Sequence, residues 1–208
     1  MGTYQKAEYY DEAYKKGTYD VDPEHISLHH YHLNWSAAIK VIHLLLNEGW
    51  RGYNPKKIEN IVDLGCGPGH FAQMLNLDGI NYHGYDFSNV AIEKATERLK
   101  GEKNKKFYVM DLEKDFPKHE NVIYTSFEFF EHIPFDFDIL NKLKKDDFII
   151  FSVPSFDTES HVQYFPEQSD VTDRYSEFLR DLQIFYWAGG VTPEGINHTI
   201  YVVIGRKK

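Results

Sequence analysis

Two carboxylates and an imidazole stand close together in an aromatic stretch of the chain, residues 126–138, which reads SFEFFEHIPFDFD. Glu128, Glu131 and His132 are spaced i, i+3 and i+4, so in a helical turn all three would face one side. Burying such groups among phenylalanines is costly unless hydrogen bonds or an opposite charge compensate them. The stretch therefore needs either a position at a pocket or a ligand of opposite charge.

A second imidazole follows at His161, after an apolar run at residues 146–153 that predicts a strand. If this strand neighbours the one ending near Glu128, strand spacing lets His161 reach the same edge of the sheet. Two carboxylates and two imidazoles form a mixed set that suits magnesium, manganese, iron or zinc, and a divalent ion would lower the pKa of an acceptor hydroxyl. Two other interpretations stay open: a metal-free pocket with His132 or His161 as general base, and a purely structural role.

A glycine-rich turn, VDLGCGPGH at residues 62–70, follows a predicted strand and opens a predicted helix. Glycines tighten such a turn and let backbone N–H groups approach a ligand at the helix N-terminus. The spacing G-x-G-x-G differs from the nicotinamide-binding G-x-G-x-x-G, and the preceding Asp63 suits a cationic amino-acid cofactor better than a pyrophosphate. Asp86, after the next predicted strand, is placed to accept hydrogen bonds from both ribose hydroxyls. Asp111, after the third predicted strand, is placed to accept a hydrogen bond from the adenine amino group.

Strands and helices alternate along the chain, which predicts an α/β fold with a mostly parallel sheet. Predicted strands cover residues 58–64, 80–87, 106–110, 121–127, 146–153, 183–189 and 198–205, and predicted helices cover residues 27–48, 70–75, 88–100, 136–145 and 171–182. The last two strands are joined by a loop alone, so they should pair antiparallel. We expect residues 1–50 to form a tyrosine-rich arm and a lid helix, and residues 51–208 to form the core of one structural domain.

The composition predicts a soluble globular protein, with 42% hydrophobic and 16% aromatic residues. A net charge of −9 repels phosphate backbones, which makes a nucleic-acid partner unfavourable. Cys66 is the only cysteine, so an internal disulfide is impossible and a reducing compartment is expected. The longest aliphatic run, VIHLLL, is too short to span a bilayer, and the N-terminal residues lack the apolar region of a secretion signal. We expect a cytoplasmic monomer or homodimer.

In their order along the chain, the glycine loop, Asp86 and Asp111 resemble the class I S-adenosylmethionine-dependent methyltransferases, over residues 58–208. The resemblance implies a Rossmann-like seven-stranded sheet of order 3-2-1-4-5-7-6, with strand 7 antiparallel and helices on both faces. It also implies S-adenosylmethionine as the cofactor. The residues that it implies as cofactor contacts are Asp63, Gly65, Cys66, Gly67, Gly69, His70, Asp86, Phe87, Met110, Asp111, Leu112 and Phe127.

The E-x-x-E-H pattern with a downstream histidine resembles two methyltransferase families that use a divalent cation. These are the ubiquinone-pathway O-methyltransferases and the small-RNA 3′-terminal 2′-O-methyltransferases. Carried over residue by residue, this resemblance implies Glu128, Glu131, His132 and His161 as metal ligands, with His132, His161 and Glu128 also in catalytic roles.

Aromatic and histidine residues near both ends of the predicted fold are candidates for acceptor contacts. N-terminal tyrosines can fold over a cofactor and exclude water from its sulfonium. The candidate substrate-binding residues are Tyr9, Tyr10, His29, Tyr164 and Phe165. The sequence thus predicts O-methylation of a small-molecule hydroxyl (a sugar, a phenol or another metabolite), assisted by a divalent metal. The alternatives are metal-free O- or N-methylation of a small molecule with histidine as base, RNA-terminal 2′-O-methylation, and a non-catalytic cofactor-binding subunit.

Overall fold

The computed structural model describes residues 2–19, 30–47, 49, 58–191 and 197–208. Contacts divide the chain into two compact units: the first is Ala7–Tyr124, and the second is Thr125–Lys208 together with Met1–Lys6. The glycine loop belongs to the first unit, and the glutamate–histidine stretch belongs to the second.

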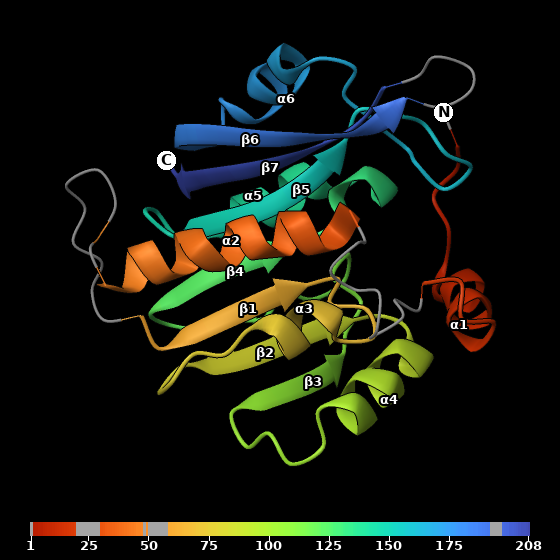
Figure 1. Cartoon of the computed structure of the whole chain (residues 1–208), viewed down its shortest axis with the longest axis vertical. Coiled ribbons are helices and arrows are strands. Elements are labelled where there is room, and N and C mark those ends of the chain that lie inside the picture. The colour runs from red at the N-terminus through yellow and green to blue at the C-terminus, as the bar shows by residue number, and fades with distance from the viewer. Residues whose placement is uncertain (1, 20–29, 48, 50–57, 192–196) are drawn as a thin grey trace. The chain divides into compact units, whose positions relative to one another are not determined.

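Helices and strands alternate along the chain, as predicted (Figure 1). The helices are α1 (Ala7–Lys15), α2 (His30–Asn47), α3 (His70–Met74), α4 (Asn89–Arg98), α5 (Asp136–Lys142) and α6 (Gln168–Tyr175). The strands are β1 (Asn60–Leu64), β2 (Asn81–Asp86), β3 (Lys105–Val109), β4 (Val122–Ser126), β5 (Phe148–Pro154), β6 (Leu179–Val191) and β7 (Asn197–Lys207). A short 3₁₀ helix, Phe130–His132, follows β4.

Across the described residues, seven strands form one mixed sheet of order β3-β2-β1-β4-β5-β7-β6. Strand β2 pairs in parallel with both β1 and β3, whereas β7 pairs antiparallel with both β5 and β6. Figure 1 shows β7 as the darkest blue arrow, between β5 and β6. The predicted Rossmann-like α/β sheet, its strand order and its antiparallel strand 7 are confirmed. Because β1 and β2 run in the same direction, the loops that follow them leave the sheet at one edge.

The central strands are buried along their whole length. Every residue of β4 (VIYTS) and of β5 (FIIFSVP) is buried. Such continuous apolar runs, without alternation of polar residues, are typical of strands covered on both faces. Of the helices in the described ranges, none combines the length and apolarity that a membrane span requires.

Helix α4 begins where the sequence predicts it. The Ser88 hydroxyl accepts a hydrogen bond from Ala91 N–H at 3.1 Å, so Ser88 is the N-cap. Small side chains on this helix allow a close approach to the glycine loop: a Cβ added to Gly69 would lie 3.0 Å from the Cβ of Ala95. Gly69 is therefore required for packing as well as for its backbone conformation.

One predicted helix is displaced along the chain. The sequence predicts a helix over residues 171–182, but α6 spans Gln168–Tyr175, and β6 begins at Leu179. The helix starts early because Glu167 and Asp170 form a reciprocal capping box, in which each side chain accepts from the other residue's backbone N–H. The strand starts early because Leu179 is buried in the sheet, which outweighs the helical spacing of the sequence.

Candidate active site

The glycine loop between β1 and α3 takes a backbone path that glycine follows without strain. Gly65, Gly67 and Gly69 have φ angles of 73°, 52° and 78°, in the left-handed region. The loop is fastened to β2, because the N–H groups of Gly65 and Cys66 both donate to the Tyr85 carbonyl, at 2.8 and 3.0 Å. The predicted tight turn is present, and it joins the ends of two parallel strands.

Asp86 lies against this loop at the end of β2. Its Oδ2 accepts a hydrogen bond from Gly67 N–H at 3.0 Å, and its Oδ1 accepts one from Ser88 N–H at 2.9 Å. Only 6% of the residue is exposed, and burial raises the pKa of Asp86 from 3.8 to about 6. Since a carboxylate has about four acceptor positions, Asp86 can still accept from ribose hydroxyls.

Asp63, on β1, is buried beside β2. The Tyr82 hydroxyl donates to Asp63 Oδ2 at 2.5 Å. Burial, reinforced by the nearby Asp63 carboxylate, raises the pKa of Tyr82 well above its ordinary value, so Tyr82 remains a donor at neutral pH. One oxygen of Asp63 is therefore engaged inside the first unit, and its contact with the amino-acid part of a cofactor stays a prediction.

The segment after β3 carries the residues that were predicted to contact adenine. Met110 N–H donates to the Asp86 carbonyl at 2.8 Å, which places this segment beside the end of β2. Leu112 is buried, whereas Asp111 is half-buried. The Asp111 carboxylate accepts from Lys114 Nζ at 2.6 Å within the same turn. The structure thus puts these residues next to Asp86, and the adenine contact stays a prediction.

Three further predicted cofactor contacts are packed around the loop. Cys66 is buried, and burial raises the pKa of its thiol well above its ordinary value. His70, the first residue of α3, is buried and stacks on Trp35 of α2 with ring centroids 6.2 Å apart. Phe87 packs against Tyr10 of α1 at a centroid separation of 5.5 Å. The packing of these three side chains stabilises the loop and its neighbours, independently of any contact with a ligand.

Helix α1 is fastened onto the same region of the first unit. Tyr14 is buried, and a Cβ added to Gly67 would lie 3.2 Å from the Tyr14 hydroxyl. The Asp11 carboxylate accepts from the Ser88 hydroxyl at 2.5 Å and from Val90 N–H at 3.3 Å, at the start of α4. The tyrosine-rich arm therefore lies on the glycine loop and on the helix that follows Asp86.

The second unit brings together three of the four predicted metal ligands. One ligand atom of each of Glu131, His132 and His161 lies within 4.8 Å of the others. The two imidazole rings meet edge to face, with centroids 4.9 Å apart. The carboxylate and one imidazole come from the 3₁₀ helix after β4, and the other imidazole comes from the loop after β5.

Both imidazoles are held at Nδ1 by backbone carbonyls. His132 Nδ1 donates to the Ser160 carbonyl at 3.0 Å, and His161 Nδ1 donates to the Phe156 carbonyl at 3.0 Å. Carbonyls only accept, so each Nδ1 carries the proton and each Nε2 offers a lone pair. Burial lowers the pKa of His132 to about 4 and also lowers that of His161, so both rings are neutral at pH 7.

Glu131 is fully buried, with 0% exposed. In the described part of the chain, no donor forms a hydrogen bond with either of its carboxylate oxygens. Burial raises the pKa of Glu131 well above its ordinary value, and the nearby Glu128 raises it further. An ionised carboxylate in such a place needs a positive charge. Two neutral imidazole nitrogens beside one carboxylate fit a divalent cation, since this donor set holds zinc and iron in other proteins.

Glu128 does not join this group of ligand atoms, so the four-ligand set is reduced to three among the described residues. The predicted helical turn starts only at Phe130, and Glu128 has a left-handed backbone with φ 51°. Its side chain lies on β5 instead: Ser152 Oγ donates to Glu128 Oε1 at 2.6 Å and accepts from Glu128 N–H at 2.8 Å. Burial raises the pKa of Glu128 to about 7. The preceding Phe127 is half-buried.

The predicted acceptor contacts differ in their exposure and belong to both units. Tyr9 is 39% exposed, whereas Tyr10 is half-buried beside the end of β2. In the second unit Phe165 is a core residue with 4% exposed, and Tyr164 is half-buried. His29 lies outside the described residues. The contacts of these residues with an acceptor stay a prediction.

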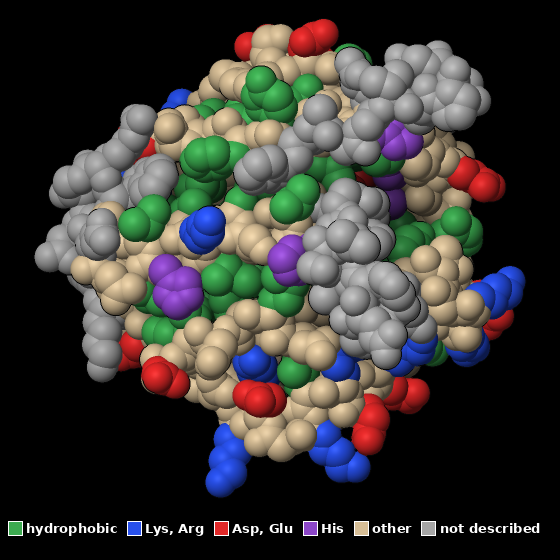
Figure 2. Space-filling view, in the orientation of Figure 1, with side chains coloured by type: hydrophobic (Ala, Val, Ile, Leu, Met, Phe, Trp, Pro, Cys, Tyr) green, Lys and Arg blue, Asp and Glu red, His purple; other side chains and the backbone are tan. Residues whose placement is uncertain are grey.

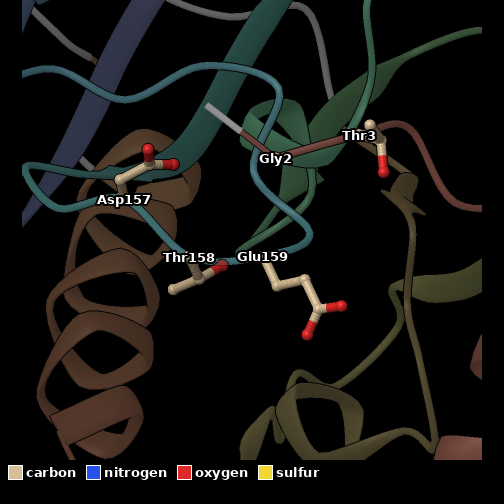
Figure 3. A pocket seen from close by; sticks show the side chains of 5 residues that line it. All are labelled: Gly2, Thr3, Asp157, Thr158 and Glu159. Carbon is tan, nitrogen blue, oxygen red and sulfur yellow. The ribbon is translucent and has the colours of Figure 1, made fainter.

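A pocket of about 490 Å³ opens in the second unit, beside the loop that carries His161 (Figure 3). It is lined by Gly2 and Thr3 and by the loop residues Asp157, Thr158 and Glu159. Figure 3 shows Thr158 and Glu159 extending from neighbouring positions of the loop, below the N-terminal segment that carries Gly2 and Thr3. The N-terminal residues are fastened there, because Gly2 N–H donates to the His161 carbonyl at 2.8 Å.

Three positions with a part in these sites were missed by the sequence analysis. They are Asp11, which holds α1 on α4, Ser152, which holds Glu128, and Gln163, which follows His161. In each case the side chain forms a hydrogen bond with a residue far away in the sequence. Such a partner is not indicated by the residue spacings that predict helices and strands. Only the folded backbone reveals such contacts.

A family model described as a methyltransferase domain matches residues 55–182, a range that includes the glycine loop, Asp86 and the glutamate–histidine group. The chain belongs to this methyltransferase family. No curated protein matches the sequence.

Solved structures of methyltransferases have the same fold. One is phosphoethanolamine N-methyltransferase 2 of Haemonchus contortus, in complex with phosphomonomethylethanolamine and S-adenosylhomocysteine. It is 13% identical to this chain with a TM-score of 0.60, and the match covers 82% of this chain and 52% of the Haemonchus chain. The CurJ carbon methyltransferase is 12% identical with a TM-score of 0.65, and the match covers 84% of this chain and 54% of the CurJ chain. The N-methyltransferase NodS of Bradyrhizobium japonicum WM9, in complex with S-adenosyl-L-homocysteine, is 16% identical with a TM-score of 0.64, covering 94% and 97%. The present chain spans about half the length of the first two.

The predicted membership of a methyltransferase family is confirmed, and the use of S-adenosylmethionine by this chain stays a prediction. The similar structures are named for transfer to nitrogen and to carbon, so this fold alone leaves the acceptor atom open.

Proposed function

We propose that this methyltransferase methylates a hydroxyl oxygen of a small molecule, with a divalent cation held by Glu131, His132 and His161. The observation that carries the proposal is a fully buried carboxylate that accepts no hydrogen bond from any described residue and lies beside two imidazoles. Both rings are already fixed at Nδ1 by backbone carbonyls. This outer support is the arrangement that orients histidine ligands in metal sites.

The cofactor side of the proposal rests on the first unit. We infer that the glycine loop and the N-terminus of α3 hold the amino-acid part of S-adenosylmethionine, and that Asp86 accepts from its ribose hydroxyls. The closeness of Met110 to Asp86 supports an adenine site at the end of β3. The named complexes of the Haemonchus enzyme and of NodS with S-adenosylhomocysteine support the same cofactor.

Two imidazoles among three ligands favour zinc or iron over magnesium and manganese, which prefer oxygen donors. When bound, such an ion acts as a Lewis acid that lowers the pKa of an acceptor hydroxyl. The protein's own contribution is to orient both Nε2 lone pairs, to keep the rings neutral, and to supply one negative charge from Glu131. A nearby carboxyl, Glu128, is held by Ser152 with a pKa of about 7, so it can take up a proton released at neutral pH.

The charge distribution favours a small and uncharged acceptor over RNA. The chain has a net charge of −9, and Asp157 and Glu159 line the pocket beside the His161 loop. On the face shown in Figure 2, side chains of Lys and Arg are interspersed with those of Asp and Glu, and the described residues form no extended basic stripe there. A polyanion gains little from such a surface.

Metal-free methylation with a histidine as base is the second candidate, because the hydrogen bonds at Nδ1 leave Nε2 of each imidazole unprotonated in the neutral tautomer. Its weakness is the pKa of His132, about 4, which makes that imidazole a poor base at neutral pH. His161, whose pKa is also lowered by burial, is the other imidazole that could serve as the base.

Elemental analysis of the purified full-length chain separates the two candidates. We expect one equivalent of a divalent metal in the wild type, and its loss in both Glu131→Gln and His161→Ala. His43→Ala is the matched control, because His43 is an exposed histidine on α2 in the other unit. S-adenosylmethionine binding, measured by calorimetry, should be unchanged in all three variants. Full methyl transfer after exhaustive chelation, with no stoichiometric metal, would decide for the metal-free enzyme.

A further inference from the structure

The loop that follows His161 is fastened to the 3₁₀ helix that carries Glu131. The backbone N–H groups of Val162 and Gln163 both donate to the Glu131 carbonyl, at 2.8 and 3.3 Å. His132 Nδ1 donates to the Ser160 carbonyl of the same loop at 3.0 Å. The spacing between the carboxylate and the two imidazoles therefore depends on how this loop and this turn are held together.

The side chain of Gln163 makes a second connection. Its Nε2 donates to the Phe130 carbonyl at 2.7 Å and to Asp136 Oδ2 at 3.2 Å. The amide has two N–H groups, so one can serve each acceptor. One acceptor is at the start of the 3₁₀ helix and the other is the first residue of α5, so Gln163 ties the His161 loop to both.

Asp136 is a rigid anchor for this connection. It is fully buried, and Arg174 of α6 binds it with two hydrogen bonds, from Nε at 2.9 Å and from Nη2 at 2.8 Å. The Tyr175 hydroxyl donates to the same carboxylate at 3.1 Å, and the Arg174 guanidinium lies 4.2 Å from the centroid of the Phe137 ring. A bidentate pair with a stacked guanidinium has little freedom to move.

We propose that Gln163 is a positioning residue for the group of Glu131, His132 and His161, with the Asp136–Arg174 pair as its anchor. The inference rests on the proposed function, because it assigns to Gln163 the task of setting the distance between donors on two separate loops. The role assigned to Gln163 is to hold the ligand-bearing loop in place and not to bind the cation. Outer-shell partners of metal ligands typically contribute 10–100-fold to metal affinity, and the same effect is expected of Gln163.

The test is titration of the metal-free full-length chain with Co²⁺, followed by calorimetry and by the visible absorption of the bound ion. Gln163→Met keeps the length of the side chain but removes both donors, and it should weaken Co²⁺ binding by about 10–100-fold and change the absorption spectrum. Gln163→Asn keeps the amide but is too short to reach both acceptors, so it should weaken binding in the same direction. It also provides the test if the methionine variant does not fold.

Asp181→Asn is the matched control. Asp181, on β6, accepts a hydrogen bond from Arg206 Nε at 2.8 Å. Asp181→Asn therefore weakens a polar contact in the same unit as the Gln163 variants, but the altered pair is not part of the His161 loop. Its Co²⁺ affinity and spectrum should stay at wild-type values even where its thermal stability falls as far as that of Gln163→Met. This comparison separates positioning from general destabilisation.

Wild-type Co²⁺ affinity in both Gln163 variants, together with loss of binding in His161→Ala, would overturn the positioning role and leave the metal site standing. Weakened binding in Asp181→Asn equal to that in Gln163→Met would also overturn it, because the effect would then follow stability alone. No Co²⁺ binding by the wild type would remove the metal site and, with it, the positioning role.

Discussion

Replacing Gly67 by alanine should destabilise the first unit far more than the same replacement at Gly79. Both glycines have left-handed backbones, with φ angles of 52° and 73°. At Gly79 an added Cβ meets nothing within 4 Å, whereas at Gly67 it lies 3.2 Å from the Tyr14 hydroxyl. Gly79→Ala therefore measures backbone strain alone, and Gly67→Ala measures strain together with the collision.

The expected sizes follow from these two contributions. The left-handed strain of alanine, partly offset by the reduced entropy of the unfolded chain, should cost about 1 kcal/mol at each site. Overpacking against a buried hydroxyl adds about 1–3 kcal/mol at Gly67. For a chain of this size about 1 kcal/mol lowers Tm by roughly 3 °C, so we expect losses of about 3 °C for Gly79→Ala and about 9 °C for Gly67→Ala.

Thermal unfolding of a double-mutant cycle with Tyr14→Phe tests the mechanism. Without the hydroxyl, the nearest Tyr14 atom to the new Cβ is Cζ at 3.9 Å, an ordinary contact. Gly67→Ala should therefore cost about 1–3 kcal/mol less in the Tyr14→Phe background. Equal Tm losses at both glycines, or no relief by Tyr14→Phe, would show that α1 does not lie on the glycine loop as described.

Three further outcomes are expected. The pKa of Asp86 is about 6, and the proposed contact with the ribose hydroxyls uses its ionised form. We therefore expect the affinity for S-adenosylmethionine to fall below about pH 6, and calorimetry should show a flat pH profile for Asp86→Asn. The free energy of unfolding of the cofactor-free protein depends on pH in the opposite direction. The stabilisation by protonated Asp86 is complete below pH 3.8 and is lost as the pH rises through about 6. Asp11→Ala removes two hydrogen bonds at the start of α4 and should lower Tm by about 3 °C, through a loss of about 1 kcal/mol; an unchanged Tm would contradict the docking of α1. Cys66, buried with a raised thiol pKa, should react with a thiol reagent only at the rate at which the first unit opens, so fast labelling of the folded protein would contradict its burial.

The sheet and the glycine loop could be predicted from the sequence because local rules specify them. The alternation of strand and helix patterns predicted the α/β fold, and the family resemblance supplied the strand order. Ser88 indicated the start of α4, because serine is a favourable N-cap. The boundaries of α6 could not be predicted from spacing alone, because the burial of Leu179 in the sheet is a tertiary effect. Tertiary packing overrides helical periodicity wherever the two disagree.

The candidate metal site was predicted as a set of residue types rather than as a geometry. His161 and Glu131 meet as expected, because β4 and β5 are neighbours in the sheet. Glu128 departs from the prediction because its backbone is left-handed, a conformation that glutamate adopts rarely and that no spacing rule indicates. Gln163 gave no signal, since its acceptors are backbone and side-chain oxygens about thirty positions earlier in the sequence.

The position of β7 between β5 and β6 has a consequence for synthesis on the ribosome. Both of its neighbours precede it in the chain, so each is synthesised before the strand that will pair with it exists. During translation β5 therefore exposes a bare apolar edge for the time needed to add some forty residues, on the order of seconds. This nascent intermediate is the species that a chaperone would have to shield, because unpaired strand edges recruit other chains.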